Sequence, residues 1–147
     1  MMNAEEESVN MSEEKSYLGL ILWMIVFLAG TVLCMFLPEK MMLRGVMQLC
    51  SVGVAVLIYM IYVNEKIYWI NGVTFEEALK ATSEQRKAFA MRHLKLFGGF
   101  AGGFLLFSVV SYALSWSEWW DFGVGTVGLI AVAIASVPIK LETKKDG

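Results

Sequence analysis

The chain has 147 residues, with twelve Lys and Arg against fourteen Asp and Glu, so its formal net charge is −2. This near-neutral balance offers no field for capturing nucleic acid. Hydrophobic residues make up 57% of the chain and charged residues 18%, whereas soluble domains have roughly 45–50% and about 25%. The composition indicates a membrane protein and argues against a soluble enzyme, a disordered chain and a disulfide-stabilised mini-protein.

The chain begins with an acidic segment, residues 1–16, which predicts a disordered cytoplasmic tail. The first apolar block follows at residues 17–37 and contains no charged residue. As a helix rising about 1.5 Å per residue, this block crosses about 30 Å of hydrocarbon. The preceding segment is acidic rather than basic, and the apolar run is longer than that of a signal peptide. We therefore interpret the block as a retained span.

Three further apolar blocks lie at about residues 45–63, 96–116 and 122–139. Each is expected to cross the bilayer as a helix, because a lone strand would leave its backbone polar groups unpaired in lipid. The predicted fold is an all-α integral membrane protein. Its four-helix membrane domain covers residues 17–139, and a cytoplasmic tail follows at residues 140–147.

Orientation is predicted from Lys and Arg, which favour the cytoplasmic side of a membrane. With four crossings, ten of these residues share a side with both termini: Lys15, Lys66, Lys80, Arg86, Lys87, Arg92, Lys95, Lys140, Lys144 and Lys145. The other side holds only Lys40 and Arg44, and the outer turn at residues 117–121 contributes none. We assign both termini to the cytoplasm and the protein to the cell membrane. The asymmetry argues against a dual-topology protein.

The segment between the second and third spans, residues 64–95, predicts a partly helical cytoplasmic loop. An Asn-Gly pair at residues 71–72 is a hairpin-type turn signal. A capping-box sequence that begins at Thr74 predicts a short helix. A second helix start at Thr82 or Ser83 predicts a helix that runs unbroken into the third span.

The second loop helix interleaves apolar residues with four basic ones: Arg86, Lys87, Arg92 and Lys95. This pattern is typical of an amphipathic helix at the membrane surface, whose cations meet anionic headgroups. The four basic residues are therefore candidate contacts to lipid or to a partner. Two interpretations stay open, namely that they only enforce the topology or that the loop docks a cytoplasmic or membrane partner.

No span carries a charged residue at mid-depth, where a carboxylate or base would indicate a proton or ion pathway. Arg44 enters its span from the outer end and is expected to extend to the interface beside Glu39. Gln48 is the most interior strongly polar side chain. It is expected to make an interhelical hydrogen bond, or alternatively to contact a polar ligand between the helices.

Sequence motifs for catalysis and metal binding are missing. Cys34 and Cys50 form no CxxC pair and are expected to be separate thiols, with a Cu(I) site beside nearby methionines as the alternative. The sole histidine, His93, is expected at the membrane surface beside two cations, so the serines of the third span have no base. We expect no enzyme activity, no cofactor and no metal.

The third span begins with two overlapping GxxxG pairs, Gly98 with Gly102 and Gly99 with Gly103, and the fourth span contains Gly128. Small residues four positions apart let another helix backbone approach closely, which is the main route to tight packing in lipid. These glycines are the predicted helix-packing interface. The interface either packs the third span on the fourth or first, or joins two copies of the chain.

The expected function is that of a non-catalytic accessory or assembly subunit, acting through its glycine-rich helix faces and its basic loop. Its partners are the lipid bilayer and either another protein or a second copy. The alternative is a small oligomeric transporter or channel, in which Gln48, Thr31 and Thr126 line a path. A membrane-embedded enzyme ranks third, and fold alone does not decide among the three.

Overall fold

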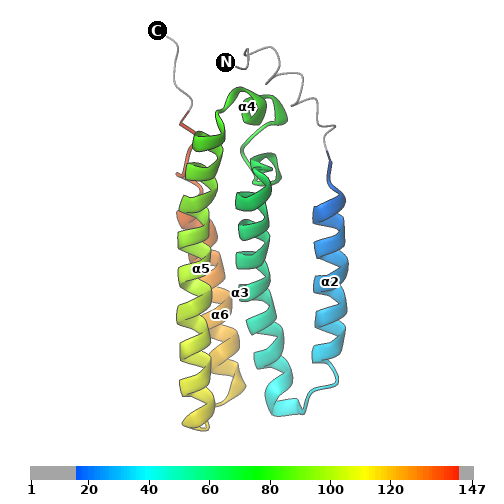
Figure 1. The fold of residues 1–147 in the computed structure, drawn as a ribbon. Coiled ribbons are helices and arrows are strands. Elements are labelled where there is room, and N and C mark those ends of the chain that lie inside the picture. Colours follow the sequence, from blue (N-terminus) through cyan, green and yellow to red (C-terminus); the bar gives the residue numbers. More distant parts are fainter. Residues whose placement is uncertain (1–15, 143–147) are drawn as a thin grey trace.

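The computed structural model describes residues 16–142. Four long helices run alternately up and down in chain order (Figure 1): α2 (Leu18–Cys34), α3 (Glu39–Asn64), α5 (Ser83–Ala113) and α6 (Glu118–Ser136). The short 3-10 helix η1 (Ile67–Trp69) and helix α4 (Phe75–Lys80) connect α3 to α5. No strand occurs in this part of the chain, so the all-helical fold class is confirmed.

Both ends of the described chain lie at the same end of the bundle as α4, which we call the loop end (Figure 1). The connections from α2 to α3 and from α5 to α6 lie at the opposite end, which we call the turn end. An even number of antiparallel passes produces this arrangement.

Three helices are long and apolar enough to cross a membrane: α3, α5 and α6, with 26, 31 and 19 residues. Helix α2 is apolar but shorter, with 17 residues, and none of its residues is buried. Large apolar side chains cover the outer surface, and Leu22 and Ile134 are 62% and 66% exposed. An apolar surface this extensive is typical of contact with lipid rather than water.

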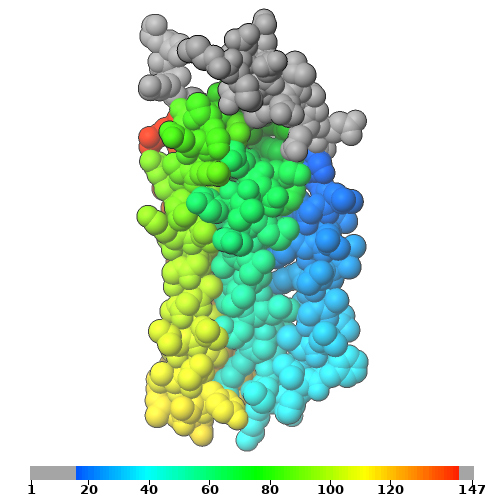
Figure 2. All heavy atoms as spheres, in the orientation of Figure 1, coloured from blue at the N-terminus to red at the C-terminus, as the bar shows by residue number. Residues whose placement is uncertain are grey.

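Helix α3 is central, because it packs on α2, α5 and α6, whereas α2 packs chiefly on α3. In Figure 2, α2 forms one edge of the elongated molecule. Glycines bring α2 and α3 together: a Cβ on Gly53 would lie 2.8 Å from the Phe27 ring, and one on Gly30 would lie 3.1 Å from Leu49. The α2–α3 contact therefore depends on glycines that the sequence analysis did not single out.

Both predicted helix starts in the loop are confirmed. The Thr74 hydroxyl accepts from the Glu77 backbone N–H, and the Glu77 carboxylate accepts from the Thr74 N–H at 2.8 Å. Thr82 and Gln85 form the same reciprocal pair at the start of α5. From there α5 runs unbroken for 31 residues, as predicted for a helix that continues into the third apolar block.

The Asn-Gly signal corresponds to a turn, in which Gly72 has a φ of +95°. The residues before this turn form η1 rather than a strand of a hairpin. The most buried apolar side chains of the molecule gather nearby, and Ile61, Ile67 and Ala90 are at most 1% exposed. The loop is therefore part of the packed core at this end of the bundle.

Candidate functional site

A buried polar cluster joins three helices at the turn end. The Arg44 Nε on α3 donates to Asp121 Oδ2 on α6 at 2.9 Å, and the Ser111 hydroxyl on α5 donates to the same oxygen at 2.7 Å. The Arg44 and Asp121 side chains are 11% and 0% exposed. We refer to Arg44, Ser111 and Asp121 as the turn-end cluster.

Arg44 makes further contacts within the same region. Its Nη2 donates to the backbone carbonyl of Trp116 and, at 3.4 Å, to the Ser111 hydroxyl. The guanidinium also lies over the Tyr112 ring, 5.5 Å from its centroid. The expectation that Arg44 extends to the interface beside Glu39 is wrong, because its charged head turns inward to these partners.

The position of Asp121 explains why the ion pair was missed. The sequence analysis placed residues 117–121 in an outer turn, whereas α6 begins at Glu118 and Asp121 lies in its first turn. There the carboxylate benefits from the positive end of the helix dipole. Because Arg44 precedes Asp121 by 77 residues in the chain, no local spacing indicates the pair.

Gln48 lies one turn further along α3. Its Nε2 donates to the Phe104 carbonyl on α5 at 3.3 Å, which is an interhelical hydrogen bond of the kind expected. Gln48 Oε1 is buried and has no hydrogen-bond partner within residues 16–142, whereas the Asp121 carboxylate also has the Ser108 hydroxyl of α5 beside it. The Thr31 hydroxyl instead donates to the Phe27 carbonyl of its own helix.

The predicted glycine interface divides into two groups. A Cβ placed on Gly98, Gly99, Gly102 or Gly103 would have no atom within 4 Å. A Cβ on Gly128 would overlap the Phe100 ring, and one on Gly125 would lie 2.8 Å from Phe104. The α5–α6 contact is therefore made by phenylalanines of α5 against glycines of α6.

The four glycines of α5 consequently face away from the neighbouring helices of the chain. We call Gly98, Gly99, Gly102 and Gly103 the open glycine face. Sequence reasoning missed the role of Phe100 and Phe104, although their spacing of four places them on one side of the helix.

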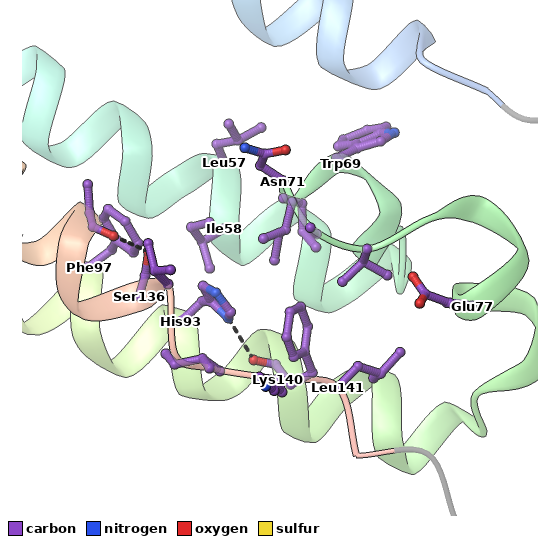
Figure 3. Close-up of a pocket in the computed structure, with 18 residues that line it drawn as sticks. Leu57, Ile58, Trp69, Asn71, Glu77, His93, Phe97, Ser136, Lys140 and Leu141 are labelled. Atoms are coloured by element: carbon purple, nitrogen blue, oxygen red, sulfur yellow. Dashed lines mark hydrogen bonds between the residues drawn. The ribbon is translucent and has the colours of Figure 1, made fainter.

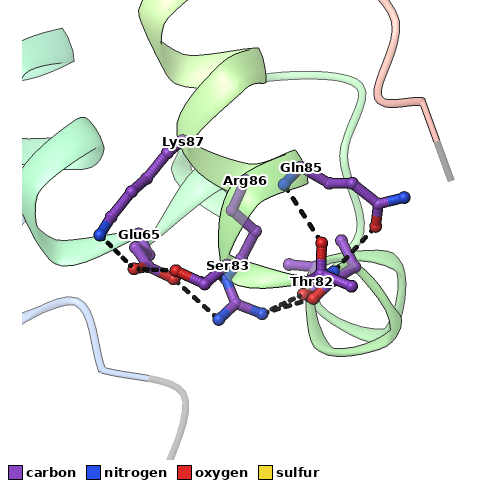
Figure 4. Close-up of polar contacts among 8 residues, drawn as sticks. Glu65, Thr82, Ser83, Gln85, Arg86 and Lys87 are labelled. Atoms are coloured by element: carbon purple, nitrogen blue, oxygen red, sulfur yellow. Dashed lines mark hydrogen bonds and ion pairs between the residues drawn. The ribbon is translucent and has the colours of Figure 1, made fainter.

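The four basic candidates of the loop differ in their surroundings. Figure 4 shows Arg86 turned toward the end of α3, where it contacts Glu65 Oε2 through Nε and Nη2 at 2.9 and 2.8 Å. Lys87 approaches the other Glu65 oxygen at 3.3 Å, and Arg92 pairs with Glu142 at 2.7 Å. Lys95 is exposed and forms no ion pair within the described residues.

In Figure 4 the Glu65 carboxylate is contacted by Ser83, Arg86 and Lys87. We call these four residues the loop clamp. Burial raises the pKa of Glu65, but hydrogen bonds from Ser83, Arg86 and Lys87 lower it by more than burial raises it. The pKa of Glu65 therefore lies below its ordinary value. Arg86 also donates to the Ala78 and Ala81 carbonyls. The loop clamp therefore ties the end of α3 to α4 and α5.

A cavity of about 790 Å³ lies at the loop end between α3, the loop from Trp69 to Glu77, α5, α6 and the segment that follows α6 (Figure 3). His93 lines it, with its ring 4.6 Å from that of Phe89. His93 was expected at the membrane surface beside two cations. That expectation is wrong, because His93 is only 3% exposed and faces the bundle interior.

Cys34 and Cys50 are free thiols. Within residues 16–142, no group of three or more His, Cys, Asp or Glu side chains is placed to hold a metal ion. Residues 1–15 of the predicted acidic tail and residues 143–147 lie outside the described residues.

Comparisons with protein families, curated proteins and solved structures found no match to the chain. The class of the protein thus follows from its fold: three long apolar helices in an all-helical bundle indicate a membrane protein.

Proposed function

We propose that this chain is a four-pass membrane protein, with both termini in the cytoplasm, that acts as a non-catalytic accessory or assembly subunit. The observation that carries the proposal is the open glycine face of α5, which no other part of the described chain covers. A face of small residues lets another transmembrane helix approach closely enough for extensive van der Waals contact. The partner is a helix of another membrane protein or of a second copy.

The arrangement of the helices supports four crossings. Helix α2 runs alongside α3 between the loop end and the turn end (Figure 1). Its 17 residues carry no charge and span about 25 Å, which is within the usual range for a membrane helix. Crossing by α2 also places both ends of the described chain on one side.

The distribution of cations supports a cytoplasmic loop end. Lys66, Lys80, Arg86, Lys87, Arg92, Lys95 and Lys140 lie there, whereas Lys40 and Arg44 lie toward the turn end. Since Arg44 is buried in the turn-end cluster, Lys40 is the one exposed cation of the described chain at that end. Burial of Arg44 therefore increases the difference in exposed cations between the two ends, as the positive-inside rule expects for a cytoplasmic loop end.

A second candidate, a small transporter or channel, has one observation in its favour. Gln48 Oε1 is a buried acceptor that lacks a donor in the described chain. Its amide Nε2 is bonded to the Phe104 carbonyl, and the Phe104 ring packs against Gly125 of α6. The polar groups thus fit a helix-joining role better than a continuous path.

Replacing Gly102 with Leu tests the proposal, because a leucine there has space within the protomer but fills the open glycine face. We expect Gly102→Leu to keep the thermal stability of the protomer and to lose the oligomer or the stoichiometric protein partner. The measurement is native mass spectrometry of the full chain extracted from its own membranes in mild detergent.

Gly123→Leu is the matched control, since Gly123 on α6 is equally open but lies off the face. It should leave the assembly intact. Gly128→Leu should instead destabilise the protomer, because Phe100 occupies the space that the side chain needs. An assembly that survives Gly102→Leu unchanged would refute the interaction role.

A further inference from the structure

The chain continues past α6 at the loop end without forming a further helix, and we call residues 137–142 the strap. Ile139 and Leu141 are partly buried and pack against the apolar core at the loop end. The residues beside them, Pro138, Lys140 and Glu142, are exposed. This alternation is typical of an extended chain, in which successive side chains point to opposite sides. One edge of the strap therefore lies on the core and the other faces away from it.

The strap forms one wall of the loop-end cavity (Figure 3). Val137, Ile139, Lys140 and Leu141 line the cavity together with His93 of α5. His93 is 3% exposed, and Figure 3 shows the strap passing beside its ring. Movement of the strap away from α5 would therefore widen the cavity and uncover His93.

Few backbone hydrogen bonds hold the strap in place. The N–H groups of Val137 and Ile139 donate to carbonyls in the last turn of α6. The N–H groups of residues 140–142 have no acceptor within the part of the chain that the structure describes. Segments with few backbone hydrogen bonds and little buried surface open at a low free-energy cost, independently of the rest of the protein.

The far end of the strap is fastened by an ion pair at the surface. Glu142 Oε1 lies 2.7 Å from Arg92 Nη2 on α5. These side chains are 76% and 49% exposed, and ion pairs between exposed side chains contribute little to stability. The packing of Ile139 and Leu141 on the core is therefore the main contribution that keeps the strap closed.

The loop side of the cavity is held more firmly. The loop from Trp69 to Glu77 lines it, and the Glu77 side chain caps the start of α4 by bonding to Thr74. The loop clamp ties the end of α3 to α4 and α5 through the hydrogen bonds of Arg86. Of the walls of the cavity, the strap is therefore the one whose release breaks neither a helix nor a network of hydrogen bonds.

We propose that the strap is a releasable cover that controls access to the loop-end cavity. In the closed state, which the structure describes, Ile139 and Leu141 pack on the core and Glu142 pairs with Arg92. In the open state these contacts are broken, α3, α5 and α6 keep their packing, and His93 becomes accessible. The inference goes beyond the assembly role, because it concerns the loop end rather than the open glycine face of α5.

The test measures how fast diethyl pyrocarbonate modifies His93, the sole histidine, in the full chain purified in a nonionic detergent, with mass spectrometry as the readout. Leu141→Ser removes a packed side chain of the strap and should speed the modification about ten-fold. Lys140→Ser is the matched control, because the Lys140 side chain is exposed and forms no ion pair within the described chain. It should react as the unmodified chain does.

A crosslinked variant tests the same movement from the opposite direction. Arg92→Cys with Glu142→Cys, in a chain whose two native cysteines are replaced with Ala, is joined by a short bis-maleimide. The linkage should hold the strap closed and leave His93 unmodified during the time in which the same variant reacts without the crosslinker. The proposal is overturned if crosslinking does not change the rate, or if Leu141→Ser reacts no faster than Lys140→Ser.

Discussion

Arg44 shows how strongly one residue of this bundle depends on its partners. A buried charge is unfavourable unless it is paired and hydrogen-bonded. Arg44 meets both needs through the Asp121 carboxylate, the Ser111 hydroxyl and the Trp116 carbonyl. Because these groups come from α5, α6 and the turn between them, the cation fixes how three helices meet at the turn end.

Neutralising one partner of this ion pair should be more harmful than removing both. Asp121→Asn leaves the Arg44 charge buried without a counterion, which should cost about 3–5 kcal/mol of stability. The double variant Arg44→Met with Asp121→Leu removes both charges and should recover most of that loss. Thermal unfolding of the full chain in detergent, run as a double-mutant cycle, measures both values.

Arg44→Met alone completes the cycle and should also destabilise the bundle, because Asp121 then lacks its cation. If the losses from the two single substitutions simply add in the double variant, the ion pair does not couple the helices.

His93 and Arg44 also show what the sequence leaves undetermined at this scale. His93 has cations nearby in sequence, but successive residues of a helix point about 100° apart. It therefore shares a face with Phe89 and Phe97 rather than with Arg92. Spacing by four from Phe89 was the available signal. Arg44 offered no such signal, since its partner comes from a distant helix.

At the scale of elements, α5 has two faces that the sequence only partly distinguished. One face turns into the bundle and carries Phe89, His93, Phe100, Phe104, Ser108 and Ser111. The open glycine face lies on the other side. The start of the helix was predictable because a capping box is a local pattern. The face of α5 that packs on the other helices was not predictable, because both glycine and phenylalanine repeat along it at four-residue spacing.

The loop clamp makes the connection between α3 and α5 sensitive to pH. The pKa of Glu65 is lowered in the folded protein, so its ionised form contributes stability above its ordinary pKa of 4.5, and that stability is lost as pH falls through the lowered value. Glu65→Gln should cost roughly 1–2 kcal/mol at pH 7. The difference from the unmodified chain should shrink at acidic pH.

Thermal unfolding at pH 7 and at successively lower pH values below 4.5 checks this expectation. Glu84→Gln is the control, because Glu84 is exposed in the first turn of α5 and makes no ion pair within the described residues. A Glu65→Gln deficit that is equally large at both pH values would show that the carboxylate charge is not what holds the loop.

The whole molecule is a bundle whose two ends differ in kind. The loop end has the most buried apolar core, a cavity and most of the cations. At the turn end the connections between helices are short, and the turn-end cluster joins α3, α5 and α6. Composition and block lengths were sufficient to predict an all-helical membrane protein, because these features depend on no long-range contact. The cavity depends on how three helices and the loop converge.

Four crossings with a cytoplasmic loop end are the central claim, and one labelling experiment tests it most directly. Single cysteines at Glu5, Lys40, Glu76 and Ser117 are introduced after Cys34 and Cys50 are replaced with Ala. In intact cells, an impermeant thiol reagent should label the Lys40 and Ser117 positions, while Glu5 and Glu76 should react only after permeabilisation. Labelling at Glu5 from outside would show that α2 does not cross, and labelling at Glu76 would reverse the orientation.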